Sequence, residues 1–242
     1  MPTPRVNLAA ATGLDGTIYV LGGSGDDGVP LTTVEAYSPS TNTWRPVAPM
    51  STPRTNLAAV TGLDGTIYAL GGANFTSGQL DTAEAYDPKA DIWTPIASMS
   101  TRRGYPAAAV SQAGLIYVLA GLNNDDGDLS TMEVYDPFAN AWSSVAPLPT
   151  LPGGRLGPRA AVGPDGRIYA IGGLTYSALD RIWKALDTVD AYDPASDTWS
   201  PAAPMLTARG YLATATDPKG KIYALGGDDG RQVFDTAEVY GP

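Results

Sequence analysis

The sequence predicts an all-β protein built from short antiparallel strands. Glycine and proline are abundant, with 28 and 21 residues in a chain of 242, and both end strands and form turns. Apolar runs of about four residues, such as Ile18–Leu21, lie between these turn residues. An Ile-Tyr pair returns roughly every 50 residues, which indicates a repeated structural unit. The best helix candidate, Ser177–Asp187, is short.

Five copies of one pattern cover the chain, with boundaries near 1–50, 51–99, 100–149, 150–205 and 206–242. Each copy has an arginine, then Ile-Tyr, then a doublet ending in glycine, then an acidic residue two positions before a tyrosine. The first four copies end with a tryptophan strand, so a complete copy is expected to form four short strands. The landmark arginines and tryptophans are Arg5, Arg54, Arg103, Arg155 and Arg209, and Trp44, Trp93, Trp142 and Trp199.

The pattern of Arg, Ile-Tyr-x-x-Gly-Gly, Glu-x-Tyr-Asp-Pro and Trp resembles the kelch repeat over essentially the whole chain. The resemblance implies a β-propeller, with one four-stranded antiparallel blade per repeat around a central channel. A single domain over residues 1–242 is expected. The fifth repeat stops at Tyr240-Gly241-Pro242, before any tryptophan strand, so its blade is expected to have three strands. We expect the ring to close with this narrow blade; the alternatives are an incomplete chain or an open edge that pairs with another chain.

Composition excludes several classes of chemistry. The chain has no Cys and no His, which excludes disulfides, thiol nucleophiles and histidine-ligated metals. A net charge of −10 argues against a nucleic-acid partner and against an anionic membrane surface. No signal peptide and no membrane-spanning run is visible, so a soluble protein is expected and the cytoplasm is the favoured compartment. No metal and no cofactor is expected. The excess of Arg over Lys, with much Ala, Gly and Pro, is typical of a GC-rich bacterial genome.

The candidate ligand site lies on one face of the expected blades. Loops from the second to the third strand, and from the fourth strand to the next blade, share that face. Aromatic residues outside the repeat pattern gather there, and repeat four adds two insertions, 151–154 and 174–186. Loops on a rigid scaffold are the usual carriers of binding. The residues expected to bind the ligand are Arg103, Tyr105, Arg155, Tyr176, Trp183, Arg209, Tyr211, Arg5, Arg54, Asn7 and Asn56.

Each of these assignments has a structural alternative. An arginine that recurs in every copy can bind backbone carbonyls or acidic residues of the blades. The insertions can be neutral, since long surface loops cost little. The acidic run Asn124–Asp128 resembles a calcium loop only in part, and we interpret it as turn residues.

The preferred function is a binding module for an anionic small molecule or an acidic peptide, held at an Arg- and aromatic-lined channel mouth. Arginine offers planar, bidentate donors for carboxylate or phosphate, and eukaryotic kelch adaptors, which the chain resembles, bind acidic peptides through comparable arginines. A monomer is expected, with an edge-paired oligomer as the alternative.

Two other functions stay open. One is a metal-free enzyme resembling the bacterial sialic-acid mutarotases of the kelch family, with Asp180, Tyr176 and Lys184 as acid–base candidates. The other is a propeller fragment or self-assembling scaffold. Copper radical oxidases of this fold need His ligands and a Tyr–Cys crosslink, so the composition excludes that activity.

Overall fold

The computed structural model describes residues 1–149, 154–177 and 179–241, and its regular elements are all β-strands. Two compact units account for the chain: residues 1–105 with 136–142, and residues 106–135 with 143–242. Each is described separately. Among the described residues, no helix is present that could cross a membrane.

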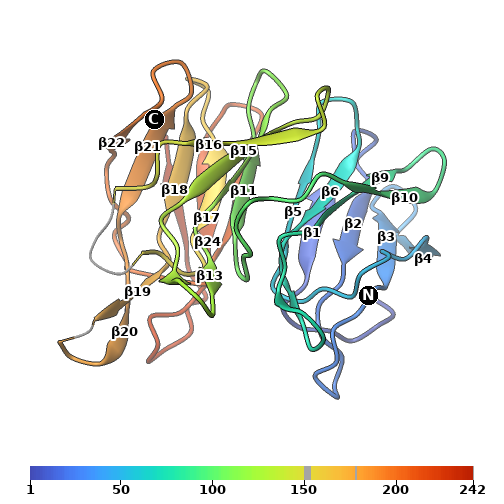
Figure 1. Cartoon of the computed structure of the whole chain (residues 1–242), viewed down its shortest axis with the longest axis horizontal. Helices are drawn as coiled ribbons and strands as arrows, with labels where there is room; N and C mark the ends of the chain where they lie inside the picture. Colours follow the sequence, from blue (N-terminus) through green and yellow to red (C-terminus); the bar gives the residue numbers. More distant parts are fainter. Residues whose placement is uncertain (150–153, 178, 242) are drawn as a thin grey trace. The chain divides into compact units, whose positions relative to one another are not determined.

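Five antiparallel sheets form the blades of the β-propeller that the sequence predicts (Figure 1). The first unit holds the first two blades, and each has four strands in the order first, second, third, fourth from one edge to the other. These strands are β1 (Ala9–Thr12), β2 (Ile18–Leu21), β3 (Val34–Ser38) and β4 (Thr43–Val47) in the first blade, and β5 (Ala58–Thr61), β6 (Ile67–Leu70), β9 (Ala83–Asp87) and β10 (Ile92–Ile96) in the second.

The second unit holds the third, fourth and fifth blades, apart from residues 136–142. The third and fourth blades have four strands, and the fifth has the three strands that its missing tryptophan segment predicts. These strands are β11 (Ala107–Val110), β12 (Ile116–Leu119), β15 (Met132–Asp136) and β16 (Ala141–Val145), then β17 (Arg159–Val162), β18 (Ile168–Ile171), β21 (Val189–Asp193) and β22 (Thr198–Pro201), then β23 (Ala213–Thr216), β24 (Ile222–Leu225) and β25 (Ala237–Tyr240).

Three short hairpins stand in the loops between the second and third strands of blades two, three and four. They are β7 (Ala73–Asn74) with β8 (Gly78–Gln79), β13 (Leu122–Asn123) with β14 (Gly127–Asp128), and β19 (Leu174–Ser177) with β20 (Ile182–Ala185). The best helix candidate of the sequence, Ser177–Asp187, does not form a helix, because β20 pairs with β19 over four residue pairs. A helix of that length is marginal by itself, whereas the hairpin gains cross-strand side-chain contacts.

The tryptophan residues of blades two, three and four bind the blade that precedes each of them in the chain. Trp93 stacks on Tyr86, directly opposite on β9, with ring centroids 5.0 Å apart. Its indole Nε1 donates to the carbonyl oxygen of Ala48 in the first blade, at 2.8 Å. Asp91 accepts the backbone N–H of the same Ala48 at 2.8 Å. The fourth strand therefore contributes both apolar packing and two hydrogen bonds to the neighbouring blade.

The glycine doublets explain how the chain leaves the second strand. Gly22 has a φ of 57°, and a Cβ atom there would lie 2.3 Å from the carbonyl oxygen of Arg54. Only glycine fits so close to a neighbouring backbone without displacement. The third repeat has Ala120 at this position and still holds it in the left-handed region, at a φ of 58°.

Candidate functional site

The landmark arginines are buried inside the blades. Arg54, fully buried, donates from Nε and Nη2 to Glu84 Oε1 at 3.2 and 2.9 Å. Its Nη1 donates to the carbonyl oxygens of Gly71 and Thr82 at 2.9 and 2.8 Å. The guanidinium thus joins the start of a repeat to the second and third strands of the same repeat.

Other repeats use the same arrangement. Arg5 pairs with Glu35 at 2.9 Å, Arg155 with Asp190 at 2.6 Å, and Arg209 with Glu238 at 2.8 Å. Arg103 is also fully buried. In repeats one, two, four and five the acidic residue of the landmark is therefore the partner of the landmark arginine, as the structural alternative requires. Contact between these guanidiniums and a ligand stays a prediction, and their burial does not support it.

The charges of the second repeat's ion pair are stabilised by hydrogen bonds. Burial alone would raise the pKa of the Glu84 carboxyl, but donation by Ser51 and the charge of Arg54 outweigh it and lower this pKa. Burial lowers the pKa of Arg54 from a very high starting value, so the guanidinium stays charged. A buried pair of this kind is costly to break, because the remaining charge has no partner.

The residues two positions after the arginines precede the first strand of each blade and have left-handed backbones. They do not continue an extended strand from the arginines, since Asn7, Asn56 and Tyr105 have φ values of 56°, 55° and 55°. The N–H of Asn56 donates to the carbonyl oxygen of Asn7 at 2.9 Å, and that of Tyr105 to Asn56 at 2.8 Å. In the first unit they form a hydrogen-bonded series from blade to blade.

The same position in the second unit brings Tyr211 close to Gly157. Both have left-handed φ values, of 50° and 57°. A Cβ atom on Gly157 would lie 3.0 Å from the Tyr211 ring, so the glycine leaves room for this side chain. Tyr211 is 39% exposed. A left-handed tyrosine is uncommon, and residues held in such conformations often occur at functional sites.

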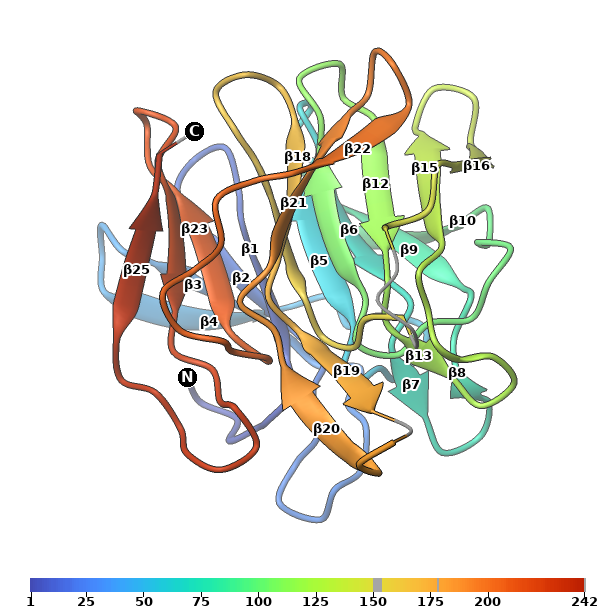
Figure 2. The ribbon, with the colours of Figure 1, turned by 90° about the vertical axis from the view of Figure 1, so that its left-hand side faces the viewer.

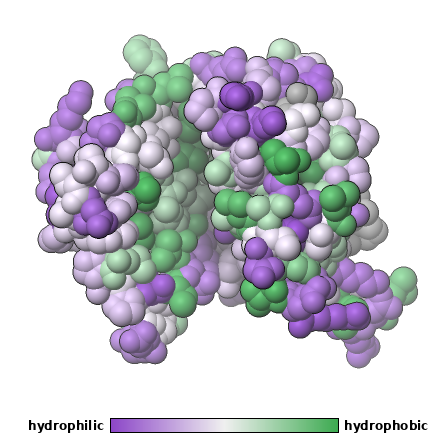
Figure 3. All heavy atoms as spheres, turned by 180° about the vertical axis from the view of Figure 1, so that it is seen from behind, coloured by the Kyte–Doolittle hydropathy of each residue, from purple (hydrophilic) through white to green (hydrophobic). Residues whose placement is uncertain are grey.

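The hairpin β19–β20 presents two exposed aromatic side chains. Tyr176 and Trp183 face each other across the hairpin, with ring centroids 5.5 Å apart and edge-to-face geometry. Their exposed fractions are 40% and 42%. The hairpin projects at the lower left of Figure 1 and the lower right of Figure 3, where hydrophobic and hydrophilic atoms lie side by side. Of the other insertion, residues 151–153 lie outside the described residues.

The acid–base candidates of the hairpin form a local ion pair. Lys184 contacts Asp180, and the Ser177 hydroxyl donates to Asp180 at 2.9 Å. Together Lys184 and Ser177 lower the pKa of the Asp180 carboxyl, so it is ionised at neutral pH. A general acid would need a raised pKa.

Asp128, at the end of β14, is a titratable residue that the sequence analysis treated as a turn residue. Burial raises the pKa of its carboxyl to about 6, against a hydrogen bond from the Tyr176 backbone that lowers it. Gly154 lies against it, since a Cβ there would be 2.2 Å from the Asp128 carbonyl oxygen. Among the described residues, no group of three or more acidic side chains could hold a metal ion.

Comparison with protein families identifies the class of this chain. Residues 1–173 match the KLHDC2/KLHL20/DRC7 Kelch-repeats domain, and residues 155–206 match the Kelch motif. The first match covers more than half of the chain. The protein therefore belongs to the kelch-repeat family.

Individual relatives are similar over shorter stretches. An F-box/kelch-repeat protein of Arabidopsis thaliana is 38% identical over 82 residues, 32% of this chain and 16% of the relative. Human Kelch-like protein 23 is 40% identical over 81 residues, 34% of this chain and 13% of the relative. Galactose oxidase of Gibberella zeae is 42% identical over 52 residues, 21% of this chain and 8% of the relative. The matches span only a small part of these relatives.

The solved structure of YjhT is similar in fold. It superposes with a TM-score of 0.85 at 16% sequence identity, covering 99% of this chain and 82% of that chain. At this level of identity the likeness concerns the fold alone.

Proposed function

We propose that this protein is a kelch-type binding module whose partner is another polypeptide, held on the loop face of the second unit. The observation that carries the proposal is the exposed pair Tyr176 and Trp183 on the hairpin β19–β20. Tyrosine and tryptophan dominate the energetic centres of protein interfaces, because they bury a large rigid surface at a low cost in side-chain entropy.

The position of this pair supports recognition rather than packing. The repeat tyrosines and tryptophans are buried or partly buried, whereas both aromatic residues of the hairpin are exposed. Four residue pairs fix the register of the hairpin, and the edge-to-face ring contact fixes the two side chains against each other. A partner therefore meets a preorganised surface, which lowers the entropic cost of binding.

We also propose that the partner is anionic. The buried arginines do not support this part of the proposal. The support that remains is the exposed Arg181 at the hairpin turn and the Lys184 amine beside Asp180, which is half exposed. An acidic peptide is thus the preferred partner, and an anionic small molecule is the narrower alternative.

The test is a selection of linear peptides from a displayed random library on the immobilised protein. Selected peptides should bind the wild type, and Trp183→Ala should weaken them at least tenfold. Phe138→Ala is the matched control, because Phe138 is a fully exposed aromatic residue in the turn between β15 and β16. Enrichment of Asp and Glu, with affinity that falls as salt rises, would support the anionic part. Peptides insensitive to Trp183→Ala would overturn the assignment of the site.

A further inference from the structure

The first strand of blade four begins with an arginine where the other four blades have an alanine. Arg159 opens β17, and the residues at this position in the other repeats are Ala9, Ala58, Ala107 and Ala213. Arg159 is not part of the repeated ion pair, which Arg155 forms with Asp190 in this blade. Four blades form with alanine at this position, so the blade itself does not require the arginine.

Arg159 is a cation without an acidic partner. Among the described residues, it makes one hydrogen bond, from Nη1 to the carbonyl oxygen of Pro158 at 3.1 Å, and contacts no carboxylate. Burial lowers the pKa of this guanidinium, and no described carboxylate raises it, in contrast to the pair of Arg54 and Glu84. Arginine stays charged even so. A partly exposed guanidinium with unused donors is therefore present in this blade.

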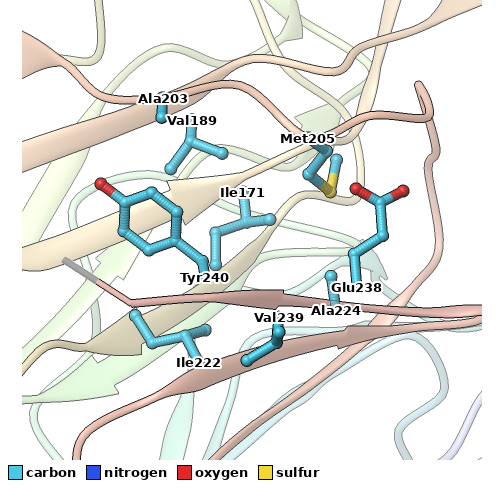
Figure 4. A pocket seen from close by; sticks show the side chains of 9 residues that line it. All are labelled: Ile171, Val189, Ala203, Met205, Ile222, Ala224, Glu238, Val239 and Tyr240. Carbon is cyan, nitrogen blue, oxygen red and sulfur yellow. The ribbon is translucent and has the colours of Figure 1, made fainter.

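The strand register places Arg159 on the side of blade four that faces blade five. Arg159 lies directly opposite Ile171 on β18. On blade five, Thr214 lies directly opposite Ala224 on β24. Ile171 and Ala224 belong to the buried cluster between the two blades and line an apolar pocket there (Figure 4; β18 and β23 are labelled in Figure 2). Opposite residues of an antiparallel pair share a face of the sheet, so Arg159 and Thr214 each face the other blade.

Alanines occupy the corresponding places in other blade interfaces. They pack in or against the apolar clusters there, as Ala9 and Ala59 do between blades one and two, and Ala107 and Ala160 between blades three and four. In the repeat alignment Arg159 takes the first place of each pair and Thr214 the second. The interface of blades four and five therefore has two polar side chains where those two interfaces have methyl groups.

The Thr214 hydroxyl lies beside the backbone of β17. Its Oγ1 contacts the carbonyl oxygen of Ala160, the residue that follows Arg159, at 3.4 Å. Hydrogen bonds from hydroxyl groups are usually about 2.7 Å long, so this contact is weak. The hydroxyl can therefore turn to a stronger acceptor, such as an anion held by the guanidinium.

The aromatic ring of Tyr211 lies next to the start of the same strand. A Cβ atom on Gly157 would be 3.0 Å from this ring. Pro158, which accepts the hydrogen bond from Arg159, follows Gly157 directly. The other repeats have Asn or Tyr in place of this glycine, so the room for the ring is also specific to repeat four. The ring, in a side chain that is 39% exposed, adds an apolar surface to this region.

We propose that Arg159 and Thr214 form a site for the carboxylate of a small organic acid, whose carbon skeleton rests on the Tyr211 ring. The planar guanidinium offers two parallel N–H donors that match the two oxygens of a carboxylate. One guanidinium neutralises one negative charge, whereas a phosphate carries more than one at neutral pH. In a chain with a net charge of −10, the carboxylate is the better fit. This site is separate from the hairpin β19–β20 and does not depend on the function proposed for it.

The probe is para-fluorobenzoate, titrated into the whole protein and followed by fluorine NMR. Its carboxylate tests the guanidinium, and its ring tests the apolar surface of Tyr211. We expect saturable binding of the benzoate and none of para-fluorobenzamide, which has the same ring without the charge. Equal binding of the two compounds, or no saturable binding of the benzoate, would overturn the proposal.

Arg159→Ala installs the residue that the other four repeats have, so the blade is expected to form. The variant should bind the probe about tenfold more weakly or worse, because the charged donors are lost. Its melting temperature should stay the same or rise, since a desolvated charge is removed. Arg167→Ala is the matched control, because this arginine of the same blade has a 45% exposed side chain, and it should bind like the wild type.

Two results with Arg159→Ala would overturn the proposal. Affinity equal to that of the wild type would show that the guanidinium does not hold the carboxylate. A melting temperature well below that of the wild type would make Arg159 a structural residue. Arg159→Lys, which keeps the charge and loses the paired donors, should have an intermediate affinity.

Two further measurements separate this site from other sources of binding. Trp183→Ala should leave the affinity for para-fluorobenzoate unchanged, and its loss would assign the probe to the hairpin and overturn the proposal. Acetate should displace the probe more effectively than inorganic phosphate at the same concentration. Stronger displacement by phosphate would overturn the assignment to a carboxylate.

Discussion

Arg54 and Trp183 illustrate two different uses of side chains in this protein. Arg54 has a counterpart in every repeat. It is fully buried and binds Glu84 and two backbone carbonyls of its own blade. Trp183 belongs to an insertion in one repeat, is 42% exposed, and contacts Tyr176 across a hairpin. Residues that recur in every repeat therefore build the scaffold, whereas residues that differ between repeats form the candidate recognition surface.

The largest expected effect on the free energy of unfolding is at the scaffold residue Arg54. Arg54→Met leaves the buried Glu84 without its cation, which should destabilise the protein by about 4 kcal/mol. Denaturant unfolding measures this change. Arg45→Met, at an exposed position on β4, is the matched control and should change stability by less than about 0.5 kcal/mol. A loss of stability in Arg54→Met as small as that in Arg45→Met would contradict the structural role of Arg54.

Removing a tryptophan from a complete blade should destabilise the protein somewhat less than Arg54→Met does. Trp199→Ala deletes an indole that packs on Tyr192 and donates to Ala146, and we expect a loss of about 3 kcal/mol. Calorimetry of wild type and variant tests it. A neutral result would contradict a structural role for the repeat tryptophans.

A smaller, pH-dependent effect is expected at Asp128. Its folded-state pKa of about 6 lies above the ordinary value of 3.8, so the folded protein loses stability as the pH rises from about 4 to 6. Asp128→Asn should therefore gain about 1 kcal/mol over the wild type above pH 6, once solvent screening is allowed for, and nothing below pH 4. Urea unfolding at pH 4 and pH 7.5 tests this, with Asp26→Asn as the control. A gain that does not depend on pH would contradict the assignment.

The smallest effect on stability is expected at the hairpin. Trp183→Ala should change the free energy of unfolding by less than about 0.5 kcal/mol, because the side chain is half exposed and lies outside the blade cores. Thermal unfolding of the wild type and the variant measures this change. A loss of 2 kcal/mol or more would make the residue part of the scaffold and would weaken the distinction between the two regions.

Much of the fold could be predicted from the sequence because the repeat places equivalent residues in equivalent surroundings. The five blades and the three-stranded last blade follow from counting the Ile-Tyr, Glu-x-Tyr and Trp landmarks. The direction of Arg54 could not be predicted in this way. It depends on partners that lie 17 to 30 residues further along the chain, namely Gly71, Thr82 and Glu84.

The site was harder to predict for similar reasons. The segment 177–187 is too short for its hydrophobic pattern to distinguish a helix from a strand. Its residues 182–185 form a strand because they pair with β19. The burial of Asp128 arises from contacts with the Tyr176 backbone and with Gly154, both far away in the sequence.

The most direct test of partner binding by the hairpin β19–β20 is a joint measurement of folding and binding for Trp183→Ala. A peptide selected on the wild type would be titrated into both proteins, whose melting temperatures would be recorded under the same conditions. We predict equal melting temperatures and an affinity at least tenfold lower in the variant, a loss of about 1.4 kcal/mol in binding free energy. Unchanged affinity in a variant that melts like the wild type would contradict the assignment of recognition to the hairpin.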